Sequence, residues 1–387
     1  MRVLIAPDKF KGSASALEVA AALAAGLKES RPDLEVVLLP VADGGEGTIG
    51  AALSAGYELV PCAAEGPVGE PVQSGFAFAG GTAVVELADV TGLRLLPGAK
   101  APLTASTYGV GQVMKAALDD GAATIVLGIG GSASTDGGAG MVEALGVRLT
   151  GEDGTEIGRG GAALAWLASV DPSGLDPRLG HGRCEVLVAS DVDNPLLGPS
   201  GAAAVFGPQK GATPAEVQVL DLALARWAEL TEAATGRHVS SKAGAGAAGG
   251  TGFAALAYFG ARLVPGVELV LDLIGFDEAL GSADLVITGE GSMDEQSLGG
   301  KAPVGVARAA AKAGVPVIAV AGRLALTPEQ VADAGFAAAY SLADLEPDQA
   351  ASMARAGELL ARIGRQIGAA GLEPGFGARL FSLQANG

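Results

Sequence analysis

Few residues of this sequence could form disulfides, bind zinc or act as histidine catalysts. The chain of 387 residues contains two cysteines, Cys62 and Cys184, and two histidines, His181 and His238. Two cysteines provide neither a disulfide framework nor the ligand spacing of a zinc site, so we expect reduced thiols in a cytoplasmic protein. Both histidines stand in polar segments, which favours surface positions over catalytic ones.

Long apolar runs, basic clusters and the Walker signature are also absent. No stretch reaches the length of a membrane span, and the apolar run before Pro7 is too short for a signal peptide. Acidic residues outnumber basic ones by 43 to 25, which argues against nucleic acid or an anionic membrane as partner. Gly300-Lys301 is followed by Ala302, so there is no P-loop. We therefore expect a cytoplasmic protein with small-molecule partners, and no heptad or apolar stripe indicates an oligomeric state.

One pattern recurs along the chain: an apolar run ends abruptly in a turn rich in Gly, Asp, Glu, Lys and Ser. A short Val/Ile/Leu run without alternation is typical of a strand buried on both faces of a parallel sheet flanked by helices. Ligands of such sheets bind outside the carboxyl ends of the strands. We therefore expect a phosphate-and-metal site where these turns face a common cleft. The five segments are Val3–Gly12, Val36–Thr48, Thr124–Gly138, Val186–Pro195 and Leu285–Gln296.

The rhythm of strands and helices indicates two domains, one inserted into the other. Strands alternate with amphipathic helices at the start of the chain, and this alternation resumes near Ala283. It predicts one doubly wound α/β domain made of residues 1–58 and 284–387. Near Tyr57 the pattern changes to short β-rich pieces separated by Gly and Pro. Residues 59–283 are therefore predicted to form an inserted α/β domain with a mixed sheet.

Asp191 and Asp193 follow the predicted strand Val186–Ala189 in a D-x-D pattern. This pattern allows an aspartyl-phosphate phosphatase with Asp191 as nucleophile, or a transferase in which one aspartate is a general base or Mg²⁺ ligand. An Asx turn is an equally good interpretation of Asp193. Asp191 lies nearer the strand end and is the stronger candidate. A protein that binds a nucleotide or organic acid without turnover is a third alternative.

Lysines and glycines give these turns the character of an anion site. Lysine acts as a point charge on phosphate or carboxylate, while glycine lets backbone N–H groups approach the oxygens. Gly44-Gly45 and Gly130-Gly131-Ser132 precede predicted helix starts and are natural N–H cradles. The G-x-G-x-x-G match at Gly244–Gly249 follows a polar segment instead of a strand, so it predicts a bent glycine loop near a ligand. The lysines flanked by Gly or Pro are Lys9, Lys11, Lys210 and Lys301.

Seven segments, in this order, resemble the motifs of the bacterial glycerate kinase family and span most of the chain. The resemblance implies a flavodoxin-like domain interrupted by a second α/β domain with a restriction-endonuclease-like topology. It also implies ATP-dependent, Mg²⁺-assisted phosphorylation of D-glycerate, with 2-phosphoglycerate favoured over 3-phosphoglycerate. The segments are APDKFKGSASA, PVADGGEGT, GIGGSASTDGGAGM, ASDVDNPLLG, VFGPQKGA, GAGAAGG and LVITGEGSMDEQSLGGKAPVGVA.

The same resemblance implies roles for residues within these segments. Asp191 is the expected general base, and the lysines would neutralise phosphate or the substrate carboxylate. The catalytic candidates are Asp191, Lys9, Lys11 and Lys301, and the metal candidates are Asp191, Glu290 and Asp43. The candidates for binding substrate or ATP are Asp43, Gly44, Gly45, Gly130, Gly131, Ser132, Asp136, Asp193, Lys210, Glu290 and Asp294.

Two segments depart from the family pattern. The family more often has Ala-Thr-Asn-Asp where this chain has Ala133-Ser134-Thr135-Asp136, and Arg-Ile-Asp where it has Ser292-Met293-Asp294. The aspartates at 136 and 294 are retained, but position 292 carries no basic side chain. The sequence therefore gives no support for a charged phosphate contact from position 292.

Overall fold

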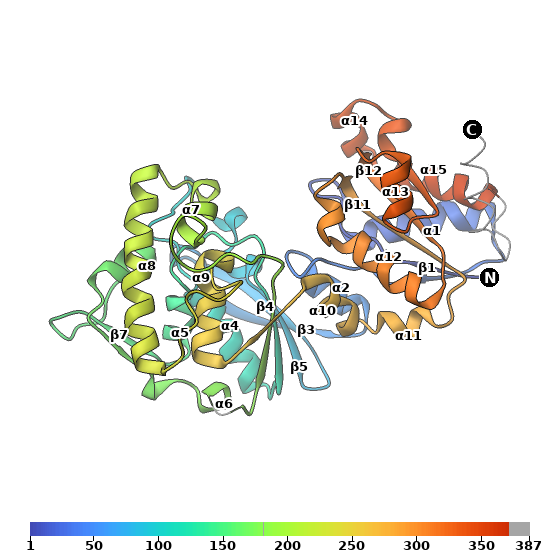
Figure 1. Ribbon diagram of the computed structural model, residues 1–387. Helices are drawn as coiled ribbons and strands as arrows, with labels where there is room; N and C mark the ends of the chain where they lie inside the picture. The colour runs from blue at the N-terminus through green and yellow to red at the C-terminus, as the bar shows by residue number, and fades with distance from the viewer. Residues whose placement is uncertain (181, 371–387) are drawn as a thin grey trace. The chain divides into compact units, whose positions relative to one another are not determined.

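The computed structural model describes residues 1–180 and 182–370, which form two compact units (Figure 1). The first unit contains Met1–Asp43, Gly50–Gly56 and Val267–Gly387, of which 371–387 lie outside the described residues. The second unit contains Gly44–Ile49 and Tyr57–Gly266. His181, which the sequence suggested as a surface residue, and the end of the predicted segment 284–387 also lie outside the described residues.

The first unit is built on a sheet of five parallel strands in the order β13-β12-β11-β1-β2. Numbered along the unit, this is the 2-1-3-4-5 arrangement of flavodoxin-like doubly wound sheets. The predicted α/β fold with a parallel sheet is confirmed. The strands are β1 (Arg2–Ile5), β2 (Glu35–Leu38), β11 (Leu285–Met293), β12 (Val317–Leu324) and β13 (Ala338–Ser341).

Helices cover both faces of this sheet because successive strand residues point to opposite sides. Val3 and Ile5 pack in one core with α1 (Ala16–Ser30) and α15 (Ala356–Ala369). Leu4 packs in the core of the opposite face. Helix α1 begins at a capping box, in which the Glu18 amide donates to Ser15 Oγ at 3.3 Å and the Ser15 amide to Glu18 Oε2 at 2.8 Å. The other helices are α2 (Thr48–Ser54), α10 (Gly266–Leu273), α11 (Phe276–Leu280), α12 (Ala302–Ala313), α13 (Pro328–Asp333) and α14 (Gln349–Ala354).

Residues 267–283 belong to the first unit, although the sequence pattern assigned them to the inserted segment. Val267 and Val270 of α10 and Phe276 of α11 are buried in the same core as Val286 of β11. The boundary therefore follows packing against the parallel sheet. The sequence pattern placed the boundary near Ala283 because it did not reveal the two short helices α10 and α11.

The second unit has a mixed sheet in the order β10-β9-β6-β5-β4-β3. Strands β3, β4 and β5 form antiparallel hairpins, whereas β5, β6, β9 and β10 are parallel to one another. This is the mixed sheet that the change of pattern after Tyr57 predicted. The strands are β3 (Glu58–Glu65), β4 (Pro71–Ala79), β5 (Thr82–Glu86), β6 (Thr124–Gly128), β9 (Glu185–Ala189) and β10 (Arg262–Val264), with β7 (Arg148–Thr150) and β8 (Ser169–Asp171) as a separate pair.

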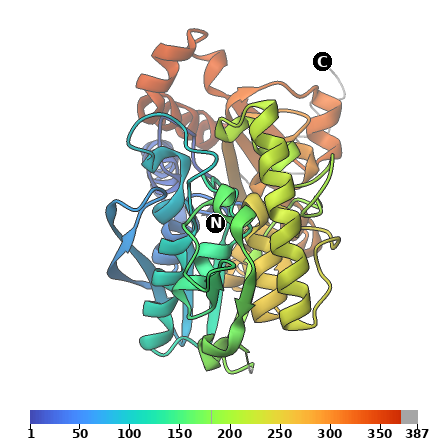
Figure 2. The ribbon, with the colours of Figure 1, turned by 90° about the vertical axis from the view of Figure 1, so that its left-hand side faces the viewer.

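The main helices of the second unit share a single core with this sheet and gather on one side of it (Figure 1). The long helix α8, yellow-green in Figure 2, carries the fully buried Trp227. Its ring stacks on Tyr258 with centroids 5.8 Å apart, and its Nε1 donates to Gly137 O at 3.0 Å. These contacts hold α8 against the glycine-rich segment after β6. The helices are α3 (Ala88–Thr91), α4 (Tyr108–Asp119), α5 (Ala139–Ala144), α6 (Pro177–Gly180), α7 (Ala202–Phe206), α8 (Pro214–Thr235) and α9 (Ala247–Ala254).

The expectations about membrane spans, cysteines and histidines can be compared with the described part of the chain. None of its helices combines the length and apolar character needed to cross a bilayer. Cys62 and Cys184 are both unpaired thiols. His238 is exposed, with its Nδ1 3.3 Å from Glu232 Oε2, as expected for a surface histidine.

Candidate functional site

The carboxyl ends of β1 and β11 lie side by side where the connections of the first sheet change direction. β1 leads into α1 on one face, and β11 leads into α12 on the other. In doubly wound sheets this switch point is where ligands bind. We refer to Asp8, Lys9, Asp43, Glu290 and Lys301, which gather at this edge, as the switch-point cluster.

Asp8 is the buried acid of this cluster, and sequence reasoning overlooked it. Asp8 is only 6% exposed. Its backbone amide donates to Gly289 O at 2.8 Å, which places Asp8 beside β11. Burial raises the pKa of Asp8 to about 6, and the nearby Asp43 adds to the rise. The ammonium group of Lys9, 3.4 Å from Asp8 Oδ1, opposes it. The available signal was the position of Asp8 directly after the buried run Val3–Ala6, the same kind of position that singled out Asp191.

Glu290 and Lys301 form the other half of the switch-point cluster. Glu290 Oε2 lies 3.3 Å from Lys301 Nζ, which also donates to Ser297 Oγ at 3.3 Å. Glu290 Oε1 is buried and has no hydrogen-bond partner. Burial raises the pKa of Glu290, with Ser297 and Lys301 opposing that effect. A buried carboxylate oxygen without a donor is costly unless a ligand or cation satisfies it.

Two other candidates in the first unit differ in how the structure holds them. Asp294 closes an Asx turn, because its Oδ1 accepts from the Gln296 amide at 3.0 Å and the Ser297 amide at 3.3 Å. Lys11 is exposed, and its backbone nitrogen lies next to Gly291 of β11. A Cβ at Gly291 would stand 3.2 Å from that nitrogen. Glycine therefore allows the segment after β1 to approach the end of β11.

In the second unit the two predicted glycine cradles come together. A Cβ at Gly128 would lie 2.8 Å from Gly44 O, and one at Gly130 would lie 2.8 Å from Gly45 Cα. Any side chain at these positions would force the two turns apart. Gly131 adopts φ of +75°, a conformation that favours glycine. The sequence thus places glycine where two backbones meet.

Glu86, a second acid that sequence reasoning missed, binds the backbone amides at the start of α2. It lies at the end of β5, where its carboxylate accepts from the Gly47 amide at 2.9 Å and the Ile49 amide at 3.1 Å. Burial raises the pKa of Glu86 to about 7, and Asp89 adds to the rise. The amino-terminal N–H groups of α2 therefore bind a carboxylate of the protein itself.

Asp136 is buried within the second unit and is saturated with donors. Its Oδ2 accepts from the Thr107 amide and hydroxyl at 2.8 and 2.9 Å, and from the Gly140 amide at 3.3 Å. Its Oδ1 accepts from the Gly138 amide at 3.2 Å. At 1% exposure it ties the start of α4 to the start of α5. The hydrogen bonds of Asp136 thus give it an internal structural role.

Lys210 is a buried lysine, 2% exposed, that holds the glycine-rich segment after β6. Its Nζ donates to Ser132 Oγ at 2.8 Å and to Ser134 O. On the other side, a Cβ at Gly249 would lie 2.9 Å from Nζ, so the bent glycine loop closes over the ammonium group. Ala248 in that loop has φ of +52° and is the one non-glycine residue of the described chain with positive φ. Burial lowers the pKa of Lys210 to about 7, while the charge of Asp136 opposes the change.

We predict that Lys210→Met changes how stability depends on pH. The pKa of Lys210 is about 7 in the folded chain and about 10.5 in the unfolded chain. The free-energy cost of burying its positive charge is therefore largest below pH 7. As pH rises from 7 towards 10.5, the wild type loses this penalty, whereas the variant never had it. The free energy of unfolding of the wild type should therefore rise relative to that of the variant, by on the order of a few kcal/mol. Urea unfolding across this pH range measures the change.

The control for Lys210→Met is Lys242→Met, which removes an exposed lysine from the same unit. That variant should follow the wild type at every pH. If the two variants show the same dependence on pH, Lys210 does not carry the predicted burial penalty.

Asp191 and Asp193 both follow β9 and are exposed. Asp191 Oδ1 accepts from the Gly266 amide at 2.9 Å, which fixes the carboxylate at the end of the strand. Gly44 lies next to this contact, since a Cβ there would stand 2.7 Å from Gly266 Cα. No hydrogen bond within the described residues shows the Asx turn that was an alternative for Asp193. Asp191 is thus the better held of the two acids.

The comparisons with known proteins agree over most of the chain. A sequence model of the glycerate kinase family matches residues 3–371. The chain belongs to the glycerate kinase family. Glycerate kinases of Halalkalibacterium halodurans and Bacillus subtilis are 47% and 46% identical to it, over 94% and 95% of this chain and 97% of each relative. The glycerate 2-kinase of Escherichia coli K12 is 46% identical over 88% of this chain and 90% of its own length.

A solved structure extends the agreement to the fold. The crystal structure of a Salmonella typhimurium LT2 protein assigned as glycerate kinase 2 is similar to this chain with a TM-score of 0.84 and 43% identity. The similarity covers 96% of this chain and 98% of that one. The resemblance carried by the seven sequence segments is confirmed.

For a member of this kinase family, the switch-point cluster fits a partial magnesium site. Across residues 1–180 and 182–370, no three His, Cys, Asp or Glu side chains are grouped as a ready-made metal cage. Mg²⁺ often takes one or two carboxylates and completes its shell with water and substrate phosphates. The unpartnered Glu290 Oε1, with Asp43 and the buried Asp8 in the same cluster, offers hard oxygen ligands of this kind.

Proposed function

We propose that this member of the glycerate kinase family transfers the terminal phosphoryl group of ATP to D-glycerate. The proposal depends on the nearly full-length similarity to two glycerate kinases, which covers 94% and 95% of this chain and 97% of each relative. Both units are therefore included in the similarity. We favour 2-phosphoglycerate as the product because a relative with 46% identity is named glycerate 2-kinase. A reducing cytoplasm suits the unpaired Cys62 and Cys184.

The switch-point cluster supports the charge neutralisation that this reaction needs. Phosphoryl transfer depends mainly on positioning and on cations around the transferred group. We propose that Lys9 and Lys301 bind phosphate or carboxylate oxygens, with Lys11 at the exposed rim of the same edge. Mg²⁺, when bound, would supply further neutralisation of the phosphates, and Glu290 and Asp43 are its proposed ligands.

Asp191 is the proposed general base in the second unit. It would accept the proton of the glycerate hydroxyl as the oxygen attacks phosphorus. Its fixed position, held by the Gly266 amide at 2.9 Å, supports this role because a base must be oriented towards the proton it removes. Coordination of Mg²⁺ is the other role that a carboxylate at this position can fill.

A coupled assay of ADP release over a panel of small hydroxy acids tests the proposal. We expect ATP-dependent turnover with D-glycerate well above the other acids, and ³¹P NMR of the product should show the phosphate on carbon 2. Release of inorganic phosphate from phosphorylated acids without ATP would favour the phosphatase alternative. Binding without turnover would favour a sensor.

A further inference from the structure

Arg323 lies at the carboxyl end of β12, directly beside Ser292 of β11. The two residues are register partners in the parallel pair, two positions beyond the pair of Glu290 and Ala321. Both side chains are exposed. Register partners on neighbouring parallel strands lie about 4.8 Å apart, and their side chains point to the same face. Arg323 therefore stands at the edge of the sheet that carries the switch-point cluster.

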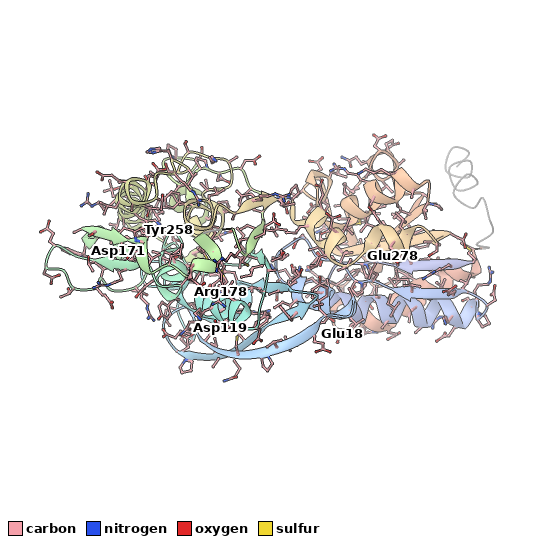
Figure 3. All side chains as sticks on the ribbon, turned by 90° about the horizontal axis from the view of Figure 1, so that it is seen from below. Glu18, Asp119, Asp171, Arg178, Tyr258 and Glu278 are labelled. Carbon is pink, nitrogen blue, oxygen red and sulfur yellow. The ribbon has the colours of Figure 1, made fainter. Side chains whose placement is uncertain are left out.

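The guanidinium of Arg323 is not engaged by the protein. Arg178, labelled with Asp119 in Figure 3, shows the contrast. Its guanidinium donates to Asp176 Oδ1 and Oδ2 at 2.9 and 2.6 Å and to Asp119 Oδ1 at 2.8 Å. Within the described part of the chain, Arg323 has no hydrogen bond or ion pair of this kind. Its five donors are therefore available to a ligand.

The position matters because both lysines of the switch-point cluster also pair with an acid, and Lys11 at the exposed rim is a single ammonium group. Lys9 is shared with Asp8, and Lys301 is shared with Glu290. An arginine can bind two oxygens of one phosphate or carboxylate at once, which lysine cannot. Ser292, where the family pattern has arginine, leaves space for such a group to come from the next strand.

We propose that Arg323 is an anion-binding residue of the switch-point edge and supplies from β12 the charge that position 292 lacks on β11. Its ligand is a phosphate or carboxylate group of a substrate. The identification of that group as part of ATP or of glycerate rests on the proposed function. Arg323 thus determines affinity for an anionic substrate without needing to take part in proton transfer.

Four variants test this assignment: Arg323→Ser, Arg323→Lys, the exchange Ser292→Arg with Arg323→Ser, and the control Arg308→Ser on the exposed side of α12. ATP binding is measured by calorimetry with Mg²⁺ and without glycerate, and the KM for glycerate is measured separately. Arg323→Ser should weaken one of these by about tenfold or more, as expected for a lost charged hydrogen bond. Weaker ATP binding identifies a phosphate ligand, and a raised glycerate KM identifies the carboxylate.

The remaining variants separate a ligand contact from a structural effect. Arg323→Lys should fall between the wild type and Arg323→Ser, and the exchange should recover most of the loss. Arg308→Ser should match the wild type, and all variants should keep its melting temperature. Less than about a twofold change in both measurements for Arg323→Ser would overturn the proposal, given the larger loss expected for such a bond. So would a loss that the exchange does not recover. The ATP measurement needs no glycerate turnover, so it does not depend on the proposed acceptor.

Discussion

Replacing Asp191 by asparagine is expected to lower kcat by about 10²–10⁴-fold while ATP affinity changes much less, because general-base catalysis contributes a factor of that size. The carboxylate can accept the hydroxyl proton of the substrate, whereas the amide cannot. Steady-state kinetics with saturating glycerate gives kcat, and calorimetry gives the Kd for ATP.

Asparagine is the informative substitution because of the contact with Gly266. Asp191 Oδ1 accepts from the Gly266 amide at 2.9 Å, and the amide oxygen of asparagine can accept the same hydrogen bond. The strand end should therefore keep its position, and the loss of rate reports the missing charge. Alanine would remove both the charge and the tether and could not separate them.

Two comparisons complete the experiment on Asp191. Asp193→Asn changes an exposed acid two residues along the same turn and should have a small effect. Lys301→Ala should weaken ATP binding as well as lower kcat, because its ammonium group is proposed to neutralise phosphate. If Asp191→Asn retains more than about a tenth of the wild-type kcat, well short of the expected loss, Asp191 is not the base and Asp193 becomes the candidate.

Local signals were sufficient to predict the elements of the first sheet. The capping box that begins α1 involves Ser15 and Glu18, which are three positions apart and match the S-x-x-E pattern. The apolar run at Leu285 becomes β11 between two parallel neighbours. Such signals depend on neighbours in the sequence, and for that reason they can be recognised without the structure.

The acids that sequence reasoning missed depend on contacts between distant segments. Glu86 receives hydrogen bonds from the Gly47 and Ile49 amides, which lie almost forty residues earlier. Asp8 is buried because its backbone pairs with Gly289, far along the chain. Neither burial nor these partners can be inferred from a short motif.

Lys210 shows how the fold adds what a motif leaves open, because its motif suggests a ligand contact and the structure gives its ammonium group internal hydrogen bonds. Its glycine and proline neighbours indicated a turn open to phosphate. The structure buries its ammonium group between Ser132 and the loop of Gly249. A glycine-flanked lysine is thus compatible with either environment, and tertiary packing decides between them.

Removal of divalent cations is expected to reduce turnover by about 10³-fold or more, because a metal ion contributes several kcal/mol to stabilising charge in such transition states. The switch-point cluster gives the physical reason. Asp8, Asp43 and Glu290 would repel the phosphates of ATP, and Lys9 and Lys301 are each shared with an acid of the cluster. Chelation with EDTA followed by back-titration with Mg²⁺ should abolish and then restore activity.

A binding measurement tests metal affinity independently of turnover. Glu290→Gln should weaken the binding of Mn²⁺ in the presence of ATP, measured by electron paramagnetic resonance, because it replaces the unpartnered carboxylate oxygen by an amide. Glu295→Gln is the matched control, since it makes the same change at an exposed position nearby. Equal Mn²⁺ affinity in the two variants would exclude Glu290 as a ligand. Unchanged turnover after exhaustive chelation would exclude the metal requirement itself, and the lysines and Arg323 would then have to neutralise the phosphates alone.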